Sequence, residues 1–293
     1  MESCGAMLSI RNSKSTNFNA AKNFFIFAVI ESGNMISAKQ SKLIRSLSQK
    51  KYRDQSRLYM VEGEKMIGEL LAGKGAEDHK LEQLFATREW ISRNDILLHQ
   101  LETEVNEASS DELKKVSNLV TPQQVLALVS IPDRKHHMEP LLSSTVLAFE
   151  AIRDPGNLGT IIRTADWFGI DHIVCTPNSV DAFNPKVVQA TMGAIARVNV
   201  YYLDLEQLLS ESGMMEKIVY GTFLEGENIY GMNMEKNPLI LFGNESHGLS
   251  NQYDQYINRK IAIPSFSQSG KGSESLNVAS SVAVVCSELK RVG

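Results

Sequence analysis

The sequence predicts an α/β protein of two domains, the second built on a mostly parallel, doubly wound sheet. Three observations support this class. From residue 146 onward, short apolar runs alternate with stretches in which apolar residues recur at helical spacing, as expected for strands joined by crossover helices. The chain of 293 residues is long enough for two domains. A polar segment at 133–144, with a proline at 140, follows Pro132 and divides the two.

The first half predicts a small α/β domain. Residues 36–57 are strongly basic, and Leu43, Ile44 and Leu47 give them an apolar stripe at helical spacing. The elements expected after this basic segment are strand 58–61, helix 64–71, strands 84–86 and 104–106, a turn or helix opening at Thr121, and strand 125–131. Residues 1–34 are expected to be an extension of low order, with an added strand at 24–30 as the alternative.

The second half predicts the sheet itself. Its expected strands are 146–152, 172–176, 198–203, 217–224, 238–242 and a last strand within 254–263. The expected helices begin at Asn157 as a cap, at Asn184-Pro185 with proline in first position and continuing to Ala196, at Leu205, and at Ser275. The expected divisions of the chain are therefore 1–34, 35–132, the linker 133–144, and 145–293.

Bulk composition excludes several classes of protein. The net charge of −4 is not that of a general nucleic-acid binder, so any such function requires a local basic surface. Cys4, Cys175 and Cys286 are scattered and lack metal-ligand spacing, which favours buried thiols in a reducing cytoplasm over disulfides or a metal site. No apolar run reaches the roughly 18 residues of a membrane span. We therefore expect a cytoplasmic protein without a metal.

Three small-residue loops follow predicted strands and carry the candidate chemistry. They are Asn157-x-Gly159-x-x-x-Arg163, Gly243-Asn-Glu-Ser-His-Gly248, and Ile261-Ala-Ile-Pro264 with Ser275-Leu-Asn277. Each also has a purely structural interpretation, as a helix cap, a turn or a flexible loop. A nucleoside triphosphate loop would need a following Gly-Lys-Ser/Thr, and a dinucleotide site would need Gly-x-Gly-x-x-Gly; neither is present. The remaining chemistry is group transfer by positioning and charge.

Taken in order, these loops resemble the three motifs of the SpoU (TrmH-like) branch of the SPOUT superfamily of RNA 2'-O-ribose methyltransferases. The resemblance covers residues 145–290, and Tyr59-Met-Val-Glu-Gly-Glu-Lys65 resembles, more loosely, the family's L30e-like substrate-binding domain. It implies a C-terminal trefoil knot, a homodimer through the knotted domain, and S-adenosylmethionine as cofactor. The loop 265–273 is longer than in many relatives. The geometry with which this loop covers the cofactor therefore does not follow from the resemblance.

The resemblance also assigns residues. Those implied to hold the cofactor, largely through backbone groups, are Gly243, Ile263 and Leu276. Those implied to form the catalytic set are Arg163, Glu245, Ser275 and Asn277, with Asn157 in support. A guanidinium is normally always protonated, so we expect Arg163 to hold substrate phosphate and stabilise the developing alkoxide, with Glu245 holding Arg163 in place.

The substrate is then RNA, because only RNA carries the 2'-hydroxyl. The basic segment offers phosphate contacts through Lys42, Arg45, Lys50, Lys51 and Arg53, although such a segment can also be merely a solvated helical face. We expect 23S ribosomal RNA as the target. The alternatives are transfer RNA methylation and a non-catalytic RNA-binding ribosome-assembly factor on the same fold; an NAD-dependent enzyme fails on the missing glycine fingerprint.

Overall fold

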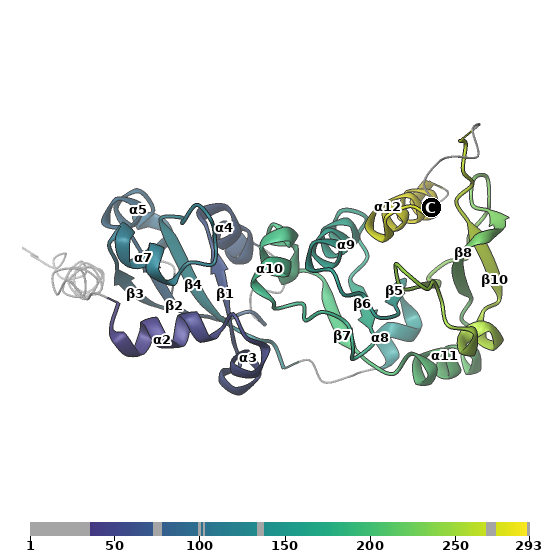
Figure 1. The fold of residues 1–293 in the computed structure, drawn as a ribbon, viewed down its shortest axis with the longest axis horizontal. Helices are drawn as coiled ribbons and strands as arrows, with labels where there is room; N and C mark the ends of the chain where they lie inside the picture. The colour runs from purple at the N-terminus through teal and green to yellow at the C-terminus, as the bar shows by residue number, and fades with distance from the viewer. Residues whose placement is uncertain are drawn as a thin grey trace, which may run out of the picture.

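The computed structural model describes residues 36–72, 78–98, 101, 103–133, 138–267 and 274–291, and it contains two sheets, each covered by helices (Figure 1). The expected N-terminal extension, with its apolar run, lies outside the described residues, as does most of the long loop 265–273. None of the helices in the described ranges is long and apolar enough to cross a membrane.

The first sheet has four strands in the order β1-β4-β2-β3. These strands are β1 (Leu58–Glu62), β2 (Leu81–Ala86), β3 (Glu104–Glu107) and β4 (Val125–Ser130). Helices α2 (Ala38–Ser46) and α7 (Ser110–Val116) supply buried side chains to one face. Helices α4 (Glu64–Ala72), α5 (Arg88–Arg93) and α6 (Asp95–Leu98) supply them to the other. The predicted strands of this half are all present, with boundaries shifted by a few residues.

The basic segment forms two helices, because α2 ends before Leu47 and a separate helix α3 (Lys50–Ser56) follows. The stripe predicted from the sequence is correct, since Ile44 and Leu47 are fully buried. The break frees the Leu47 carbonyl, which accepts a 2.7 Å hydrogen bond from Nη1 of Arg53. Arg53 is thereby turned inward, an outcome that helical spacing alone does not indicate.

The second sheet has six strands in the order β10-β8-β9-β5-β6-β7. These strands are β5 (Val146–Phe149), β6 (His172–Cys175), β7 (Asn199–Tyr202), β8 (Val219–Asn228), β9 (Leu239–Phe242) and β10 (Arg259–Ala262). Every neighbouring pair is parallel, which confirms the predicted α/β class with its parallel sheet. Because both faces are covered, all four residues of β5 and of β9 are buried, so these strands are continuous apolar runs.

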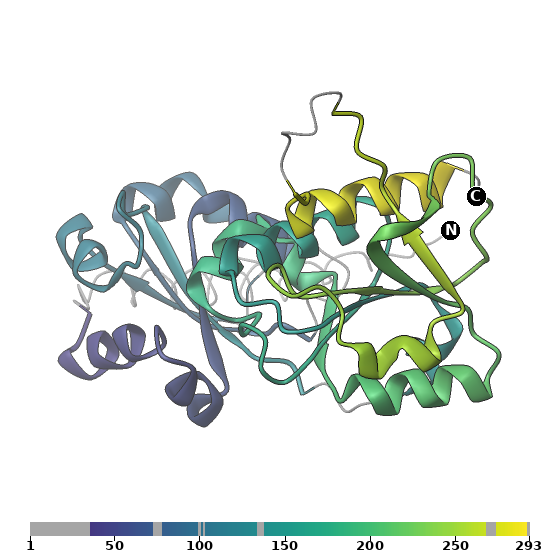
Figure 2. The ribbon, with the colours of Figure 1, turned by 45° about the vertical axis from the view of Figure 1, so that its right-hand side comes forward.

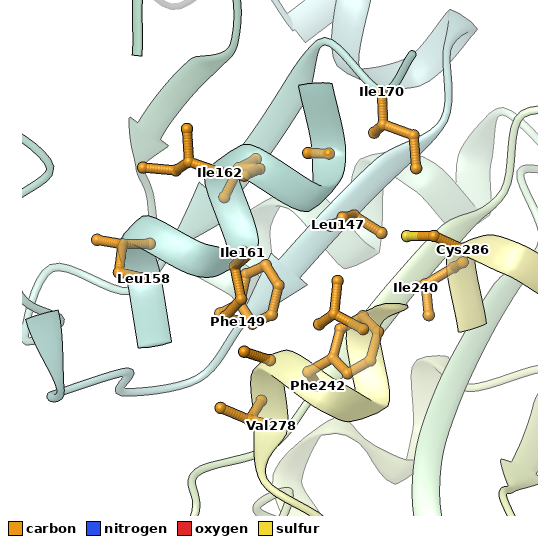
Figure 3. Close-up of a cluster of buried hydrophobic side chains, with 14 of the residues drawn as sticks. Leu147, Phe149, Leu158, Ile161, Ile162, Ile170, Ile240, Phe242, Val278 and Cys286 are labelled. Atoms are coloured by element: carbon orange, nitrogen blue, oxygen red, sulfur yellow. The ribbon is translucent and has the colours of Figure 1, made fainter. Parts of the chain in front are cut away.

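Helices cover the two faces of this sheet as separate layers (Figures 1 and 2). One face is packed by α9 (Pro155–Trp167), α10 (Pro185–Thr191), the short helix η1 (Ala194–Ala196) and α12 (Val278–Arg291). The opposite face is packed by α8 (Met138–Ser143), α11 (Leu205–Met214) and η2 (Asn251–Tyr256). Figure 3 shows the first of these cores, where Phe149 stacks on Phe242 with ring centroids 5.1 Å apart and Val278 of α12 lies close by.

Two helix boundaries differ from the predictions for local reasons. Asp154, not Asn157, caps α9, since its carboxylate accepts the Asn157 amide at 2.8 Å. The helix expected over 184–196 has the predicted Asn184 cap but ends at Thr191, because Met192 and Gly193 adopt left-handed backbone conformations with φ of 51° and 98°. The first correction matters for function, because it leaves the Asn157 side chain free for other contacts.

The expected linker 133–144 contains helix α8, whose Leu141 is fully buried in the core of the second sheet. The buried Lys217 holds the end of this segment, since its ammonium donates to the carbonyls of Leu142 at 3.3 Å, of Asn237 at 2.7 Å, and of Ser144. Polar composition predicted a connection here. It did not predict that the second half of that connection packs as part of the second sheet's helical layer.

Candidate functional site

The candidate site lies where the strand order of the second sheet reverses. From β5 the chain continues to β6 and β7 on one side, whereas β8, β9 and β10 lie on the other. In an open parallel sheet such a reversal leaves a crevice beyond the carboxyl ends of the two central strands. The segments that enter this crevice are 150–154 after β5 and 243–248 after β9, and they contain or adjoin two of the three predicted motifs.

A chain of hydrogen bonds joins one residue from each motif. Nδ2 of Asn157 donates to Oε1 of Glu245 at 3.1 Å, and Nδ2 of Asn277 donates to Oδ1 of Asn157 at 2.9 Å. Oδ1 of Asn277 also caps α12 by accepting the amide of Ala279 at 2.9 Å. Residues 120 positions apart in the sequence are thus held together at the start of two helices. The structure brings together Asn157, Glu245 and Asn277, as the sequence analysis expected.

Arg163 does not join this network. It is exposed on α9, and no ion pair links it to Glu245 among the described residues. Six residues of helix place it about 9 Å along the axis from Asn157, and on a different side of the helix. The expected Glu245–Arg163 pair is absent among the described residues, where Oε1 of Glu245 accepts from Asn157. Ser275 and Leu276 are exposed immediately before α12.

Asn244 and Ala151 also shape the crevice, and neither was singled out from the sequence. Asn244 donates from Nδ2 to the Ala151 carbonyl at 2.9 Å, and its Oδ1 accepts the Ser246 amide at 2.9 Å. Ala151 has a φ of 53°, a left-handed conformation that costs a non-glycine residue about 1 kcal/mol. Its amide is held by Oγ1 of Thr176 at 2.8 Å. The position of Asn244, next to Glu245 after a buried strand, was the available signal.

Gly243 lies at a backbone crossing inside the loop after β9. A Cβ atom at this position would lie 2.2 Å from the Gly248 carbonyl carbon and 2.3 Å from the Leu249 nitrogen. The loop is closed by a reciprocal pair of backbone hydrogen bonds between Asn244 and Gly248, at 3.0 and 2.9 Å. Only glycine fits here, so this residue sets the shape of the segment that carries Glu245.

The cysteines do not contribute a nucleophile. Burial raises the pKa of the Cys175 and Cys286 thiols to about 12, which keeps them protonated. Within the described ranges, no cluster of three or more His, Cys, Asp and Glu side chains could hold a metal ion. The crevice thus offers carboxylates, several amides and hydroxyls, and a guanidinium on the adjoining helix.

The predicted RNA-contacting residues divide into three groups. Lys42, Arg45 and Lys51 are exposed, as a phosphate contact requires. Lys50 is exposed but pairs with Asp54 at 2.9 Å. Arg53 is only 1% exposed, and its Nε and Nη2 donate to Oδ2 of Asp181 at 2.9 and 2.5 Å. The prediction that Arg53 contacts RNA is wrong, because its charge is buried against a residue of the second domain.

Two family models match this chain, one in each half. The SpoU rRNA Methylase family model matches residues 144–287, and the MRM3-like substrate binding domain model matches residues 39–127. The two matches correspond to the two sheets, and the substrate-binding-domain match covers all of the basic helix α2 except its first residue.

Among curated relatives, the chain is 29% identical to the Bacillus subtilis 23S rRNA (guanosine(2553)-2'-O)-methyltransferase RlmP, over 87% of this chain and 98% of RlmP. Among solved structures, a TrmH-family RNA methyltransferase of Porphyromonas gingivalis is 35% identical, with a TM-score of 0.76 over 89% of this chain and 100% of that one. An AdoMet-bound rRNA methyltransferase of Sinorhizobium meliloti is 26% identical, with a TM-score of 0.75 over 88% of this chain and 97% of that one. Since the similarity spans both domains and includes all three loops, the chain belongs to the SpoU rRNA methylase family.

Proposed function

We propose that this protein is an S-adenosylmethionine-dependent RNA methyltransferase that methylates a ribose 2'-hydroxyl of 23S ribosomal RNA in the cytoplasm. The observation that carries the proposal is the Glu245–Asn157–Asn277 chain of hydrogen bonds at the strand-order reversal of a SpoU-family sheet. The name of the RlmP relative supports the ribosomal target. A non-catalytic factor on this fold would be free to lose these polar residues, whereas Arg163, Glu245, Ser275 and Asn277 are all present.

The residues around the crevice fit this cofactor. Leu276 is 53% exposed and Phe266 78% exposed, apolar surface of the kind that an adenine ring covers. Backbone groups near Gly243 and the half-buried Ile263 complete the proposed cradle. The cofactor supplies an activated methyl group. The protein therefore has to position the ribose and manage one proton and the charge that develops on oxygen.

The proposed catalytic roles follow from which groups are free and which are held. Arg163 is exposed on α9, so its guanidinium is available to a substrate phosphate and to the developing 2'-alkoxide. Asn157 and Glu245 fix each other, which holds the loop after β9 against the start of α9. Ser275 and Asn277 precede α12 and orient the ribose, with Asn277 also bound to Asn157.

Replacing Arg163 tests the central assignment. Arg163→Ala should lower methyl transfer to RNA at least 100-fold, on the order of one lost charge-stabilising group, because it removes the guanidinium proposed to stabilise the developing alkoxide. Binding of S-adenosylmethionine, measured by calorimetry, should stay within about twofold, since no proposed cofactor contact is removed. Near-normal turnover of this variant would contradict the assignment. Lys290→Ala, an exposed cation at the other end of α12, serves as control.

The RNA target is tested by mapping 2'-O-methyl sites in ribosomal and transfer RNA from cells with and without this protein. The proposal expects one 23S site to lose its methyl group and to regain it when the wild-type chain, but not Arg163→Ala, is restored. A lost site in transfer RNA would instead favour the alternative target. Unchanged methylation everywhere would favour the non-catalytic factor.

We also propose the trefoil knot and the homodimer. Support for the knot comes from the segment just before α12, where Asn277 contacts Asn157 in the crevice that the loop after β9 also lines. Support for the dimer comes from Trp167, which is 85% exposed on α9, the helix that lies beside α12 (Figures 1 and 2). A second copy covering this surface would bury Trp167 and place new groups next to Arg163. Sedimentation at twice the chain mass is the expected result.

A further inference from the structure

A hollow of about 630 Å³, lined by both polar and apolar groups, lies in the first domain, between the first turns of α2 and the edge of the sheet. Lys39 and Gln40 line it from α2, and Gln83, Glu104 and Asn106 line it from β2 and β3. In the paired register of these strands, Gln83 lies opposite Glu104. The hollow is separate from the crevice that carries Asn157, since α2 and β3 lie at the end of the molecule away from α12 (Figure 1).

Asn106 is the unusual member of this lining. Its side chain is 4% exposed, and its Nδ2 atom is buried without an acceptor in the part of the chain that the structure describes. Buried amide donors are nearly always paired, and each exception calls for an explanation. Asn106 belongs to the lining of the hollow, so an acceptor that reaches this amide from the hollow would supply the missing partner.

Glu104 adds hydrogen-bond acceptors on the face of β3 that carries Asn106. It lies two residues before Asn106 on β3, so both side chains project from the same face of the strand. The exposed Glu104 carboxylate accepts one bond, from Nε2 of Gln83 at 3.2 Å, which leaves lone pairs for further donors. The hollow therefore presents an amide donor beside a carboxylate.

A basic groove along α2 adjoins this hollow and shares Lys39 and Leu43 with it. The groove adds Lys42, Arg45 and the 39% exposed ring of Tyr52. None of its three cations pairs with a carboxylate among the described residues. The groove thus offers cations and an aromatic ring beside a pocket that contains hydrogen-bonding side chains. This combination matches single-stranded RNA, in which cations bind the phosphates and an unpaired base can turn into a pocket or stack on a ring.

We infer that this hollow, the base pocket, binds an unpaired guanine of the substrate RNA. Guanine carries an acceptor, O6, beside two adjacent donors, N1–H and the N2 amino group. Asn106 Nδ2 donates to O6, while the Glu104 carboxylate accepts from N1 and N2. Adenine presents an acceptor at N1 and no N2 amino group, so it places a lone pair against the carboxylate. The inference rests on the proposed function, because the RNA that would bind here is the RNA that the crevice is proposed to methylate.

The test uses the full chain and uridine-rich single-stranded RNA with one central guanosine, inosine or adenosine, with binding followed by fluorescence anisotropy. Wild type should bind the guanosine RNA about tenfold more tightly than the adenosine RNA, as expected for one well-placed bidentate contact. Inosine, which lacks the N2 amino group, should fall between them. Glu104→Gln should bring guanosine and inosine to equal affinity, and Asn106→Leu should bring guanosine close to adenosine.

Glu89→Gln is the matched control, because Glu89 is exposed on α5, which packs on the opposite face of the same sheet. It should leave the base preference unchanged. Glu104 is exposed, so its variant tests the inference even where Asn106→Leu unfolds the domain. Equal binding of the three RNAs by wild type, while labelled methyl groups still pass to 23S RNA, would overturn the base pocket alone. Absence of methyl transfer to any RNA would overturn the proposed function.

Discussion

Asn157 shows how a single side chain can take a role different from the one its local sequence favours. Asparagine near a helix start is typical of a cap, but Asp154 occupies that position. The Asn157 amide is left to donate to Glu245 and to accept from Asn277. An amide suits this place because it offers a donor and an acceptor at once, so one residue fixes two loops that come from distant parts of the chain.

The substitution Asn157→Asp keeps the shape of the side chain and removes its Nδ2 donor to Glu245. Two carboxylates would then face each other at about hydrogen-bond distance, which raises the pKa of one of them. We expect methyl transfer to fall at least tenfold at pH 8, on the order of one lost hydrogen bond in a catalytic site, and to recover partly as the pH falls and the pair shares a proton.

The measurement is a pH series of turnover for wild type and variant. Asn251→Asp, an exposed change of the same chemistry in η2, should follow the wild-type profile. A variant at position 157 that matches wild type at every pH would show that Asn157 does not support the catalytic loops.

At the scale of one element, the loop after β9 is shaped by its own backbone. The family resemblance implied that Gly243 holds the cofactor through backbone groups, whereas the tightest approach at Gly243 is to residues 248 and 249 of the same loop. The adjoining β5 loop is held in place by Asn244, which bonds the strained Ala151. Both central loops are therefore held by contacts within the protein itself, which favours a preorganised site.

Gly243→Ala should open this loop, because a Cβ atom has no room at 2.2 Å from the Gly248 carbonyl carbon. We expect a loss of about 1 to 3 kcal/mol in the free energy of unfolding and a clear weakening of S-adenosylmethionine binding, both measured on the purified chain. Gly213→Ala, where nothing lies within 4 Å of the added methyl, is the control and should be neutral or slightly stabilising. Normal cofactor affinity in Gly243→Ala would contradict a role for this loop in binding.

In the whole molecule, the two domains are locked together rather than loosely tethered. Helix α10 packs on β1, and Val188 and Ala196 of the second domain are buried in the apolar cluster of the first. The buried Arg53–Asp181 pair crosses the junction. Arg197 crosses it as well, donating to Glu69 at 3.0 Å and to Asp166 at 2.8 Å. The basic surface of α2 is thus held at a fixed orientation to the crevice.

Arg53→Met should destabilise this junction by about 3 to 5 kcal/mol, since it leaves Asp181 largely buried without its cation. The double variant Arg53→Met/Asp181→Leu should recover most of the loss, because it removes both charges. Urea unfolding measures both, and Arg45→Met, on the exposed side of α2, should change stability by less than about 0.5 kcal/mol. An Arg53→Met variant as stable as wild type would show that the pair does not hold the domains together.

The sequence by itself determined the kind and order of the elements, because apolar periodicity depends on neighbouring residues alone. The Leu43–Leu47 stripe, the Asn184-Pro185 helix start and the buried β5 and β9 runs are all found as predicted. It also indicated that three loops would follow strands and that Glu245 would lie at one of them.

Tertiary structure alone decided how these parts meet. The strand order β10-β8-β9-β5-β6-β7 depends on contacts between distant segments, and it places the β5 and β9 loops side by side. The same distant contacts bury Arg53 against Asp181 and join Glu245 to Asn157 instead of Arg163. The residues next to a charged or amide side chain in the sequence do not indicate its hydrogen-bonding partner, because that partner comes from a distant segment that only the fold brings near.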